Sequence, residues 1–278
     1  MPDDGRMTLA EHLRELRSRL FKSVIAVTLG AIAAWIYFNP IFDLITKPYC
    51  ALPQDRRGGG ANCHLYAFNV LDQFNVRIRV AVLVAVIVTA PIWLYQLWRF
   101  VTPALYRNER RWTLGFVGVA SILFGGGSVL AYITLSKGLQ ILLQIAGSHV
   151  ETLLDVSGYL KYVIAMVLIF GLSFEFPLLI LMLNFIGVVS GRRLASWWRP
   201  VIFALFVFAA IATPSQDPFT MSMMAIPMCL LYAGAVAVCL VHDRRKAERE
   251  QIENWSDVAV EEPARLPATE NRDFTDIS

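Results

Sequence analysis

Long apolar runs separated by short charged loops dominate the first 240 residues, and they limit the possible folds more than any other feature. Each run approaches the roughly 20 residues that a helix needs to cross a hydrocarbon core about 30 Å thick. The runs are apolar on every side and do not alternate with polar residues, so they predict helices and not barrel strands. Charged residues form only 17% of the chain, against about 25% in soluble domains. The sequence therefore predicts an all-α, polytopic integral membrane protein.

Six runs are expected to span the membrane. The fifth in chain order is short, and charge indicates that it nevertheless crosses. With six crossings and the N-terminus inside, 18 of the 25 Lys and Arg residues lie on the cytoplasmic side, as the positive-inside rule requires. We therefore expect an N-in/C-in, multi-pass protein of the bacterial plasma membrane, with spans at 21–38, 80–98, 113–136, 162–186, 201–213 and 219–240.

The two ends of the chain differ from this membrane domain, which we place at residues 21–240. Residues 1–20 place four leucines on one helical stripe and predict an amphipathic helix at the cytoplasmic surface, where its basic residues suit anionic lipid headgroups. Residues 241–278 carry many acidic and basic residues without a sustained apolar period, so we expect a disordered cytoplasmic tail. The stripe consists of Leu9, Leu13, Leu16 and Leu20.

Two acidic residues on the cytoplasmic side are candidates for binding a cationic ligand. Glu15 lies in the amphipathic helix, and Glu109 lies in the first inner loop among basic residues. A guanidinium group binds a carboxylate through two parallel hydrogen bonds, which an ammonium group cannot reproduce. The simpler alternative is that Glu15 only pairs with Arg19 one helical turn later.

Glu175 is the strongest single-residue signal, because it lies within an apolar span. Acidic residues inside a membrane are costly and usually face a cavity or a polar partner. Gln96, in the second span, is a possible partner. The alternative is a protonated Glu175 bonded to a neighbouring helix. Pro177 is expected to kink this span.

Outside the membrane, Cys50 and Cys63 are a possible disulfide pair in one loop of an oxidising compartment. Asp217 lies in an outer turn, where the two interpretations are a functional residue of the outer loop and a simple cap of the last helix. The sequence carries no P-loop, HExxH or GxSxG motif, and no CxxC or His-rich cluster. We therefore expect no enzyme activity, no metal, no cofactor and no nucleic-acid partner.

Four blocks of the sequence together resemble the TatC family, the receptor components of the twin-arginine protein translocase. The likeness covers nearly all of residues 8–240. Pro48 also falls where the family carries a proline in its first outer loop. The blocks are His12 to Leu20, Pro91 through Arg99 and Phe100 into Pro103 to Arg111, Ser173 to Pro177, and Thr213-Pro214 with Asp217.

The resemblance implies a six-span receptor, shaped like a cupped hand, that binds signal peptides with consecutive arginines on folded precursor proteins. Glu15 and Glu109 would be the recognition carboxylates, and Glu175 would be the polar group of the concave face. It also implies TatA- and TatB-type single-span partners, self-association in the complex, and transport driven by the protonmotive force. The surface around the two carboxylates would comprise Leu16, Arg17, Phe100, Pro103, Tyr106 and Arg110.

Two positions depart from the family pattern. Many members carry Glu after the Leu-Tyr of the last span, where this chain has Ala233. The outer turn reads Pro-Ser-Gln-Asp, where other members commonly have Pro-Pro-Asp, so the spacing before Asp217 differs from the family pattern. An alternative function also stays open, a proton-coupled small-solute transporter using Glu175. It predicts solute counterflow by this chain alone.

Overall fold

The computed structural model describes residues 9–52, 65–101, 110–145, 155–215 and 217–261. These residues are almost entirely helical. In chain order the helices are α1 (Leu9–Ile36), α2 (Phe38–Cys50), α3 (Asp72–Val88), α4 (Ala90–Val101), α5 (Arg110–Ile145), α6 (Val156–Ser173), α7 (Phe176–Phe185), α8 (Gly191–Ser196), α9 (Trp198–Ala212) and α10 (Pro218–Glu261).

The six expected spans correspond to helices or broken helices of this structure. Helices α1, α5 and α10, and the broken pair α6–α7, are each long and apolar enough to cross a membrane, and the bent pair α3–α4 is a fifth crossing. Helix α9 is the short sixth segment, with 15 residues. The prediction of a polytopic helical membrane protein is confirmed, although α3, α5 and α6 begin several residues earlier than the sequence suggested.

Two spans are broken at prolines. Helices α3 and α4 meet at Thr89 with a bend of 62°. Pro91 lies in the first turn of α4, where its missing N–H group cannot bond to the preceding turn. Pro177 occupies the corresponding position at the start of α7, two residues after Glu175. The helix is therefore interrupted where Pro177 was expected to kink it, between Ser173 and Phe176.

Helices α5 and α6 cross at unusually short range because two glycines lie at the crossing. A Cβ atom at Gly127 would lie 2.6 Å from the carbonyl oxygen of Phe170, and one at Gly171 would lie 2.8 Å from the ring of Phe124. Small residues let the backbones of membrane helices approach in this way. The neighbouring Gly126 has open space around it. The crossing therefore depends on the glycine at 127 and not on the adjacent one.

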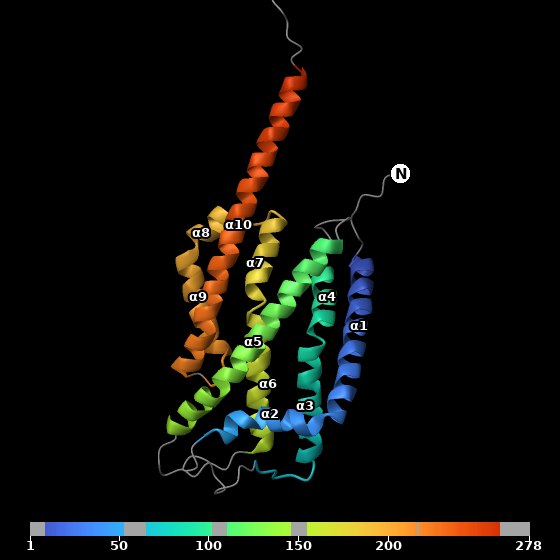
Figure 1. Ribbon diagram of the computed structural model, residues 1–278, viewed down its shortest axis with the longest axis vertical. Coiled ribbons are helices and arrows are strands. Elements are labelled where there is room, and N and C mark those ends of the chain that lie inside the picture. Colours follow the sequence, from blue (N-terminus) through green and yellow to red (C-terminus); the bar gives the residue numbers. More distant parts are fainter. Residues whose placement is uncertain (1–8, 53–64, 102–109, 146–154, 216, 262–278) are drawn as a thin grey trace, which may run out of the picture.

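Helix α2 was not predicted, since its residues were assigned to the first outer loop. It lies crosswise to the other helices in Figure 1, near the end of the bundle away from the N-terminus. The Tyr132 hydroxyl of α5 donates to the carbonyl of Leu44 at 2.8 Å, and the Tyr159 hydroxyl of α6 donates to that of Ile45 at 2.7 Å. Pro48 is buried inside this helix. Pro48 therefore belongs to a helix that packs against the bundle, and not to an open loop.

Helix α10 extends far beyond the other helices (Figure 1). The prediction of a disordered tail over 241–278 is wrong as far as Glu261, because α10 is continuous to that residue. Strong helix formers fill this stretch, and Lys246 lies 3.9 Å from Glu250 one turn later. Asp243 anchors the start of the α10 extension, because it accepts hydrogen bonds from Gly191 N at 2.6 Å and Asn184 Nδ2 at 3.0 Å. Residues 262–278 lie outside the described residues.

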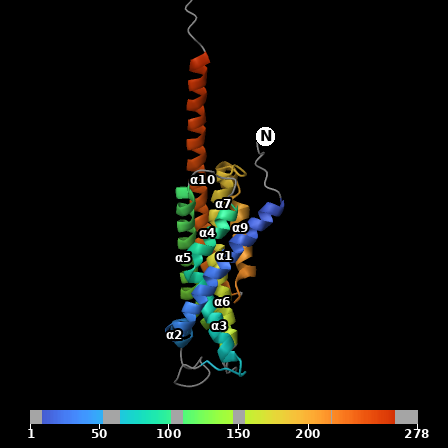
Figure 2. The same ribbon diagram turned by 90° about the vertical axis from the view of Figure 1, so that its right-hand side faces the viewer.

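One end of the bundle gathers the basic residues, and we call it the basic end. Both views show the start of α1, the end of α4, the α7–α8 connection and the α10 extension at this end (Figures 1 and 2). The positive-inside rule orients it towards the cytoplasm. Helix α9 and the start of α10 do not reach the opposite end, which α3 and α6 do reach (Figure 1). The described arginines of the basic end include Arg14, Arg17, Arg19, Arg99, Arg192, Arg193 and Arg244.

Candidate functional site

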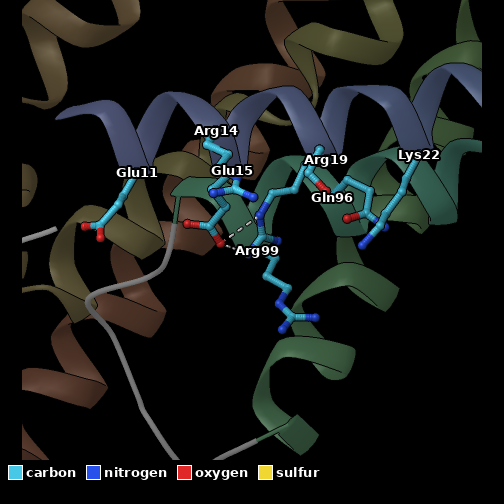
Figure 3. A pocket seen from close by; sticks show the side chains of 8 residues that line it. Glu11, Arg14, Glu15, Arg19, Lys22, Gln96 and Arg99 are labelled. Atoms are coloured by element: carbon cyan, nitrogen blue, oxygen red, sulfur yellow. Dashed lines mark hydrogen bonds and ion pairs between the residues drawn. The ribbon is translucent and has the colours of Figure 1, made fainter. Parts of the chain in front are cut away.

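A cavity of about 400 Å³ lies at the basic end, where the first turns of α1 face the last turns of α4. We call it the α1–α4 cavity. Its lining carries four cationic and two acidic side chains, so its net charge is positive (Figure 3). The lining residues are Glu11, Arg14, Glu15, Ser18, Arg19 and Lys22 from α1, and Gln96 and Arg99 from α4. Segments about 80 residues apart in sequence thus form one site.

Glu15 is paired within the chain. The Nε atom of Arg19 donates to Glu15 Oε1 at 3.1 Å, and a second guanidinium nitrogen of Arg19 bonds to the same oxygen (Figure 3). The guanidinium of Arg99 points away from this pair and donates to the Tyr95 hydroxyl at 3.1 Å. The simple alternative for Glu15, an ion pair one turn apart, therefore describes the resting chain. It leaves open what happens when a ligand arrives.

An aromatic contact joins the two helices beside this pair. The rings of His12 and Phe100 stack with their centroids 4.5 Å apart. This contact brings Phe100, expected from the resemblance to surround the carboxylate, next to the turn of α1 that carries Glu15. Leu16 and Arg17 are exposed and do not line the cavity.

The rest of the expected signal-peptide surface follows α4 in the chain. Arg110 begins α5. Glu109, Pro103 and Tyr106 lie outside the described residues. The expected pairing of Glu15 with Glu109 therefore stays a prediction.

Gln96 is not placed as a partner of Glu175. Its side chain lines the α1–α4 cavity beside Lys22 (Figure 3). Trp98, two residues later on α4, faces the opposite way and packs in a buried cluster with Leu178 of α7. Residues two positions apart on an α-helix lie about 200° apart around its axis, so α4 serves two sites. Gln96 is therefore not the partner of Glu175: its side chain lines the α1–α4 cavity, and neither carboxyl oxygen of Glu175 has a hydrogen-bond partner among the described residues.

Glu175 occupies the break between α6 and α7 and is 8% exposed. Neither carboxyl oxygen has a hydrogen-bond partner among the described residues. The Trp98 indole is the side-chain donor within interaction range. Burying a carboxyl group without hydrogen bonds costs on the order of 1 to 3 kcal/mol. This strained placement makes Glu175 a functional candidate on physical grounds, beyond its position in the sequence.

Asp217 caps the last helix, as its simple alternative predicted. Its Oδ1 atom accepts a hydrogen bond from Thr220 N at 2.8 Å, and the residue is 3% exposed. Burial acts to raise its pKa, but hydrogen bonds from Ser215 and Thr220 outweigh burial and hold the pKa below the usual value. A cap that stays ionised stabilises the positive end of the helix dipole.

Of the two outer cysteines expected to pair, only one is described. Cys50, at the end of α2, is disulfide-bonded. Cys63 lies outside the described residues, and Cys229 and Cys239 are free.

Sequence reasoning missed most of the cations of the α1–α4 cavity. Arg14, Lys22 and Arg99 were noted only as basic residues of the cytoplasmic side. The i,i+4 spacing did reveal Arg19 as a partner of Glu15. No local signal reveals Arg99, because its position relative to α1 depends on the 62° bend between α3 and α4.

Comparisons with known proteins agree with this architecture. Residues 11–227 match the family described as "Sec-independent protein translocase protein (TatC)". A TatC protein of Frankia casuarinae is 49% identical over 269 residues, covering 95% of this chain and 74% of its own length. A TatC protein of Xylanimonas cellulosilytica is 39% identical over 246 residues, covering 88% of this chain and 87% of its own length.

A solved structure shows the same fold. The crystal structure described as "Twin Arginine Translocase Receptor- TatC in DDM" is 32% identical, with a TM-score of 0.67, and it covers 82% of this chain and 99% of that one. The sequence match extends over both the α1–α4 cavity and the Glu175 break. This chain therefore belongs to the TatC family of Sec-independent protein translocase components, multi-pass proteins of the bacterial inner membrane.

Proposed function

We propose that this translocase subunit is the receptor that binds twin-arginine signal peptides of folded precursor proteins at its cytoplasmic face. Glu15 and Glu109 bind the two signal guanidinium groups. The surrounding surface is formed by Leu16, Arg17, Phe100, Pro103, Tyr106 and Arg110. The solved relative is itself described as a twin-arginine translocase receptor, which supports this assignment.

The observation that carries the proposal is the meeting of two sequence blocks at one cavity. The block at His12 to Leu20 supplies the carboxylate, and the block that begins at Pro91 supplies the opposite wall. The α4–α5 loop, which carries Glu109, leaves α4 directly after this wall. The proposal assigns both carboxylates to the cytoplasmic side, from which an unexported precursor approaches.

The chemistry fits arginine better than lysine. Charge-assisted hydrogen bonds contribute about 1.5 to 3 kcal/mol each, and a guanidinium forms two of them to one carboxylate in a fixed geometry. An ammonium group forms a single, strongly hydrated contact. Two carboxylates can thus discriminate Arg-Arg from Lys-Lys without enzyme chemistry.

Crosslinking tests the recognition role directly. A photo-reactive residue placed near Glu15 or near Glu109 should crosslink to an Arg-Arg precursor and only weakly to its Lys-Lys counterpart. Glu15→Gln and Glu109→Gln should each reduce the Arg-Arg crosslink about tenfold or more, since at least one charge-assisted pair is lost.

Glu11→Gln is the matched control, because it removes an acidic charge from the same cavity but not from the proposed pair. It should have a much smaller effect. Unchanged crosslinking in Glu15→Gln or Glu109→Gln would remove that residue from the recognition site.

Glu175 has a different role in this proposal. It lies deeper in the bundle than the α1–α4 cavity, in a break between two helices, with no hydrogen-bond partner among the described residues. It provides a polar contact for an inserted signal peptide or a partner helix on the concave face. Export through a Glu175→Ala variant at the wild-type rate would demote Glu175 to a packing residue.

The subunit acts with TatA- and TatB-type single-span proteins and with further copies of itself in the complex. Helix α1 exposes large apolar residues along most of its length, which suits lipid or a single-span helix. The energy source is the protonmotive force. Inverted membrane vesicles should lose precursor transport when a protonophore is added and retain it when ATP is removed. ATP-dependent transport that survives the protonophore would contradict this part of the proposal.

A further inference from the structure

The carboxylate proposed for recognition is occupied in the resting chain. Two nitrogens of Arg19 bond to the same oxygen of Glu15, one of them at 3.1 Å. The side chains of Arg19 and Glu15 are only 12% and 28% exposed, so the pair is partly shielded from water. Such a pair is stronger than a fully exposed one.

An incoming guanidinium and Arg19 need the same atoms. A bidentate guanidinium contact uses both oxygens of a carboxylate, and Arg19 already holds Oε1. A signal arginine can therefore bind Glu15 fully only after the Arg19 side chain has moved. The α1–α4 cavity offers space for that movement, and Gln96 offers an uncharged acceptor within it.

We propose that Arg19 is a resident competitor for Glu15, and that it sets the affinity of this site for signal peptides. The inference rests on the proposed function, because it concerns the carboxylate assigned there. In the resting state Arg19 occupies the carboxylate of Glu15. In the bound state a signal guanidinium replaces Arg19, which turns into the cavity. Arg19 thereby keeps the site closed to weakly binding cations.

A resident competitor has a specific thermodynamic signature. When only a fraction of the protein is competent to bind, the apparent dissociation constant of every ligand rises by the same factor. Removing Arg19 should therefore lower the apparent dissociation constants of the Arg-Arg and Lys-Lys peptides by the same factor. The ratio of the two dissociation constants should stay unchanged, because it depends on how well each cation matches the Glu15 carboxylate and not on Arg19.

A second effect must be separated from competition. The cavity lining has a surplus of positive charge, so removing any of its cations weakens repulsion of a dicationic peptide. Arg99 is the matched control. It lines the same cavity but donates to the Tyr95 hydroxyl and not to Glu15. Arg99→Gln thus measures the charge effect alone.

The experiment measures binding of fluorescent Arg-Arg and Lys-Lys signal peptides to the full chain in lipid nanodiscs at constant salt. Compared with Arg99→Gln, Arg19→Gln should bind both peptides about two- to fivefold more tightly, the range expected for a partly buried ion pair. Arg19→Lys, which keeps the charge without the fork, should fall between wild type and Arg19→Gln.

A double-mutant cycle completes the test. In a Glu15→Gln background, Arg19→Gln should tighten binding no more than Arg99→Gln does, because no carboxylate remains to be released. Equal binding by Arg19→Gln and Arg99→Gln in the wild-type background, or weaker binding by Arg19→Gln, would overturn the inference alone. If wild type shows no preference for Arg-Arg and Glu15→Gln binds like wild type, both the inference and the proposed function fail.

Discussion

Three carboxyl groups in this protein meet three different environments. Glu15 lies at the basic end with a cation on one oxygen. Asp217 is buried, but the backbone N–H group of Thr220 donates a hydrogen bond to its Oδ1 atom. Glu175 is almost as buried as Asp217 and has no hydrogen-bond partner among the described residues. The difference between the two buried acids is that Asp217 accepts a hydrogen bond from a backbone N–H group, whereas neither oxygen of Glu175 accepts a hydrogen bond among the described residues, which makes Glu175 the stronger functional candidate.

The packing around Glu175 differs from the packing around Glu15 as well. The Glu175 break lies beside the tight crossing of α5 and α6, where glycines bring the backbones together. Helix α1, which carries Glu15, packs on α3 and α4 and leaves most of its apolar surface exposed. We expect substitutions near Glu175 to change stability strongly, and substitutions at Glu15 to change binding more than stability.

The largest effect is expected at the glycine crossing. Gly127→Ala should lower the free energy of unfolding by about 1 to 3 kcal/mol, because the new methyl group would meet the Phe170 carbonyl. Gly126→Ala is the control, since nothing lies near its Cβ position. It should be neutral or stabilise by up to about 1 kcal/mol through helix propensity. SDS titration in mixed micelles, followed by circular dichroism, measures both, and equal destabilisation would contradict the crossing geometry.

The next effect concerns Glu175 itself. Glu175→Leu should raise the free energy of unfolding by about 1 to 2 kcal/mol, because it removes a buried polar group without hydrogen bonds. The same variant should lose precursor export in vesicles. A variant that is more stable and less active is typical of a functional residue that lowers the stability of the fold. Destabilisation of similar size would instead show that Glu175 has a structural partner.

Asp217 provides the intermediate case. Asp217→Ala should cost about 1 kcal/mol through loss of the helix cap, whereas Asp217→Asn, which can still accept the bond from Thr220, should cost much less. Because the pKa of Asp217 lies below its usual value, its ionised form stabilises the fold. That contribution should be complete at neutral pH and fall away as the pH drops below about 3.9 and through the folded-state pKa. A pH series of thermal unfolding, compared with Asp217→Asn, tests the sign.

The smallest effect on stability is expected at Glu15. Glu15→Gln removes an ion pair one turn apart on a single helix, which contributes about 0.3 to 0.5 kcal/mol. Its unfolding curve should nearly overlay that of wild type, even though signal-peptide binding falls. A loss above about 2 kcal/mol would make Glu15 a structural residue and would undermine the contrast with Glu175.

Much of the fold was predictable because membrane insertion depends on local properties. Run length and composition indicate which segments span a bilayer, and the proline at 177 indicated the kink above Glu175. The i,i+4 spacing of Glu15 and Arg19 indicated their pairing. The α10 extension was missed because high charge was interpreted as disorder, although the same residues favour a helix.

The candidate site was predictable only in part. The sequence by itself determined the membrane class, the positions of the spans and the identity of Glu15 and Glu175 as acids that need explanation. The tertiary structure was needed to show that Gln96 lines the same cavity as Glu15 and that Trp98 lies near Glu175. The reason is physical: hydrophobicity acts residue by residue along the chain, whereas the partner of a side chain depends on how a bent helix is rotated against its neighbours.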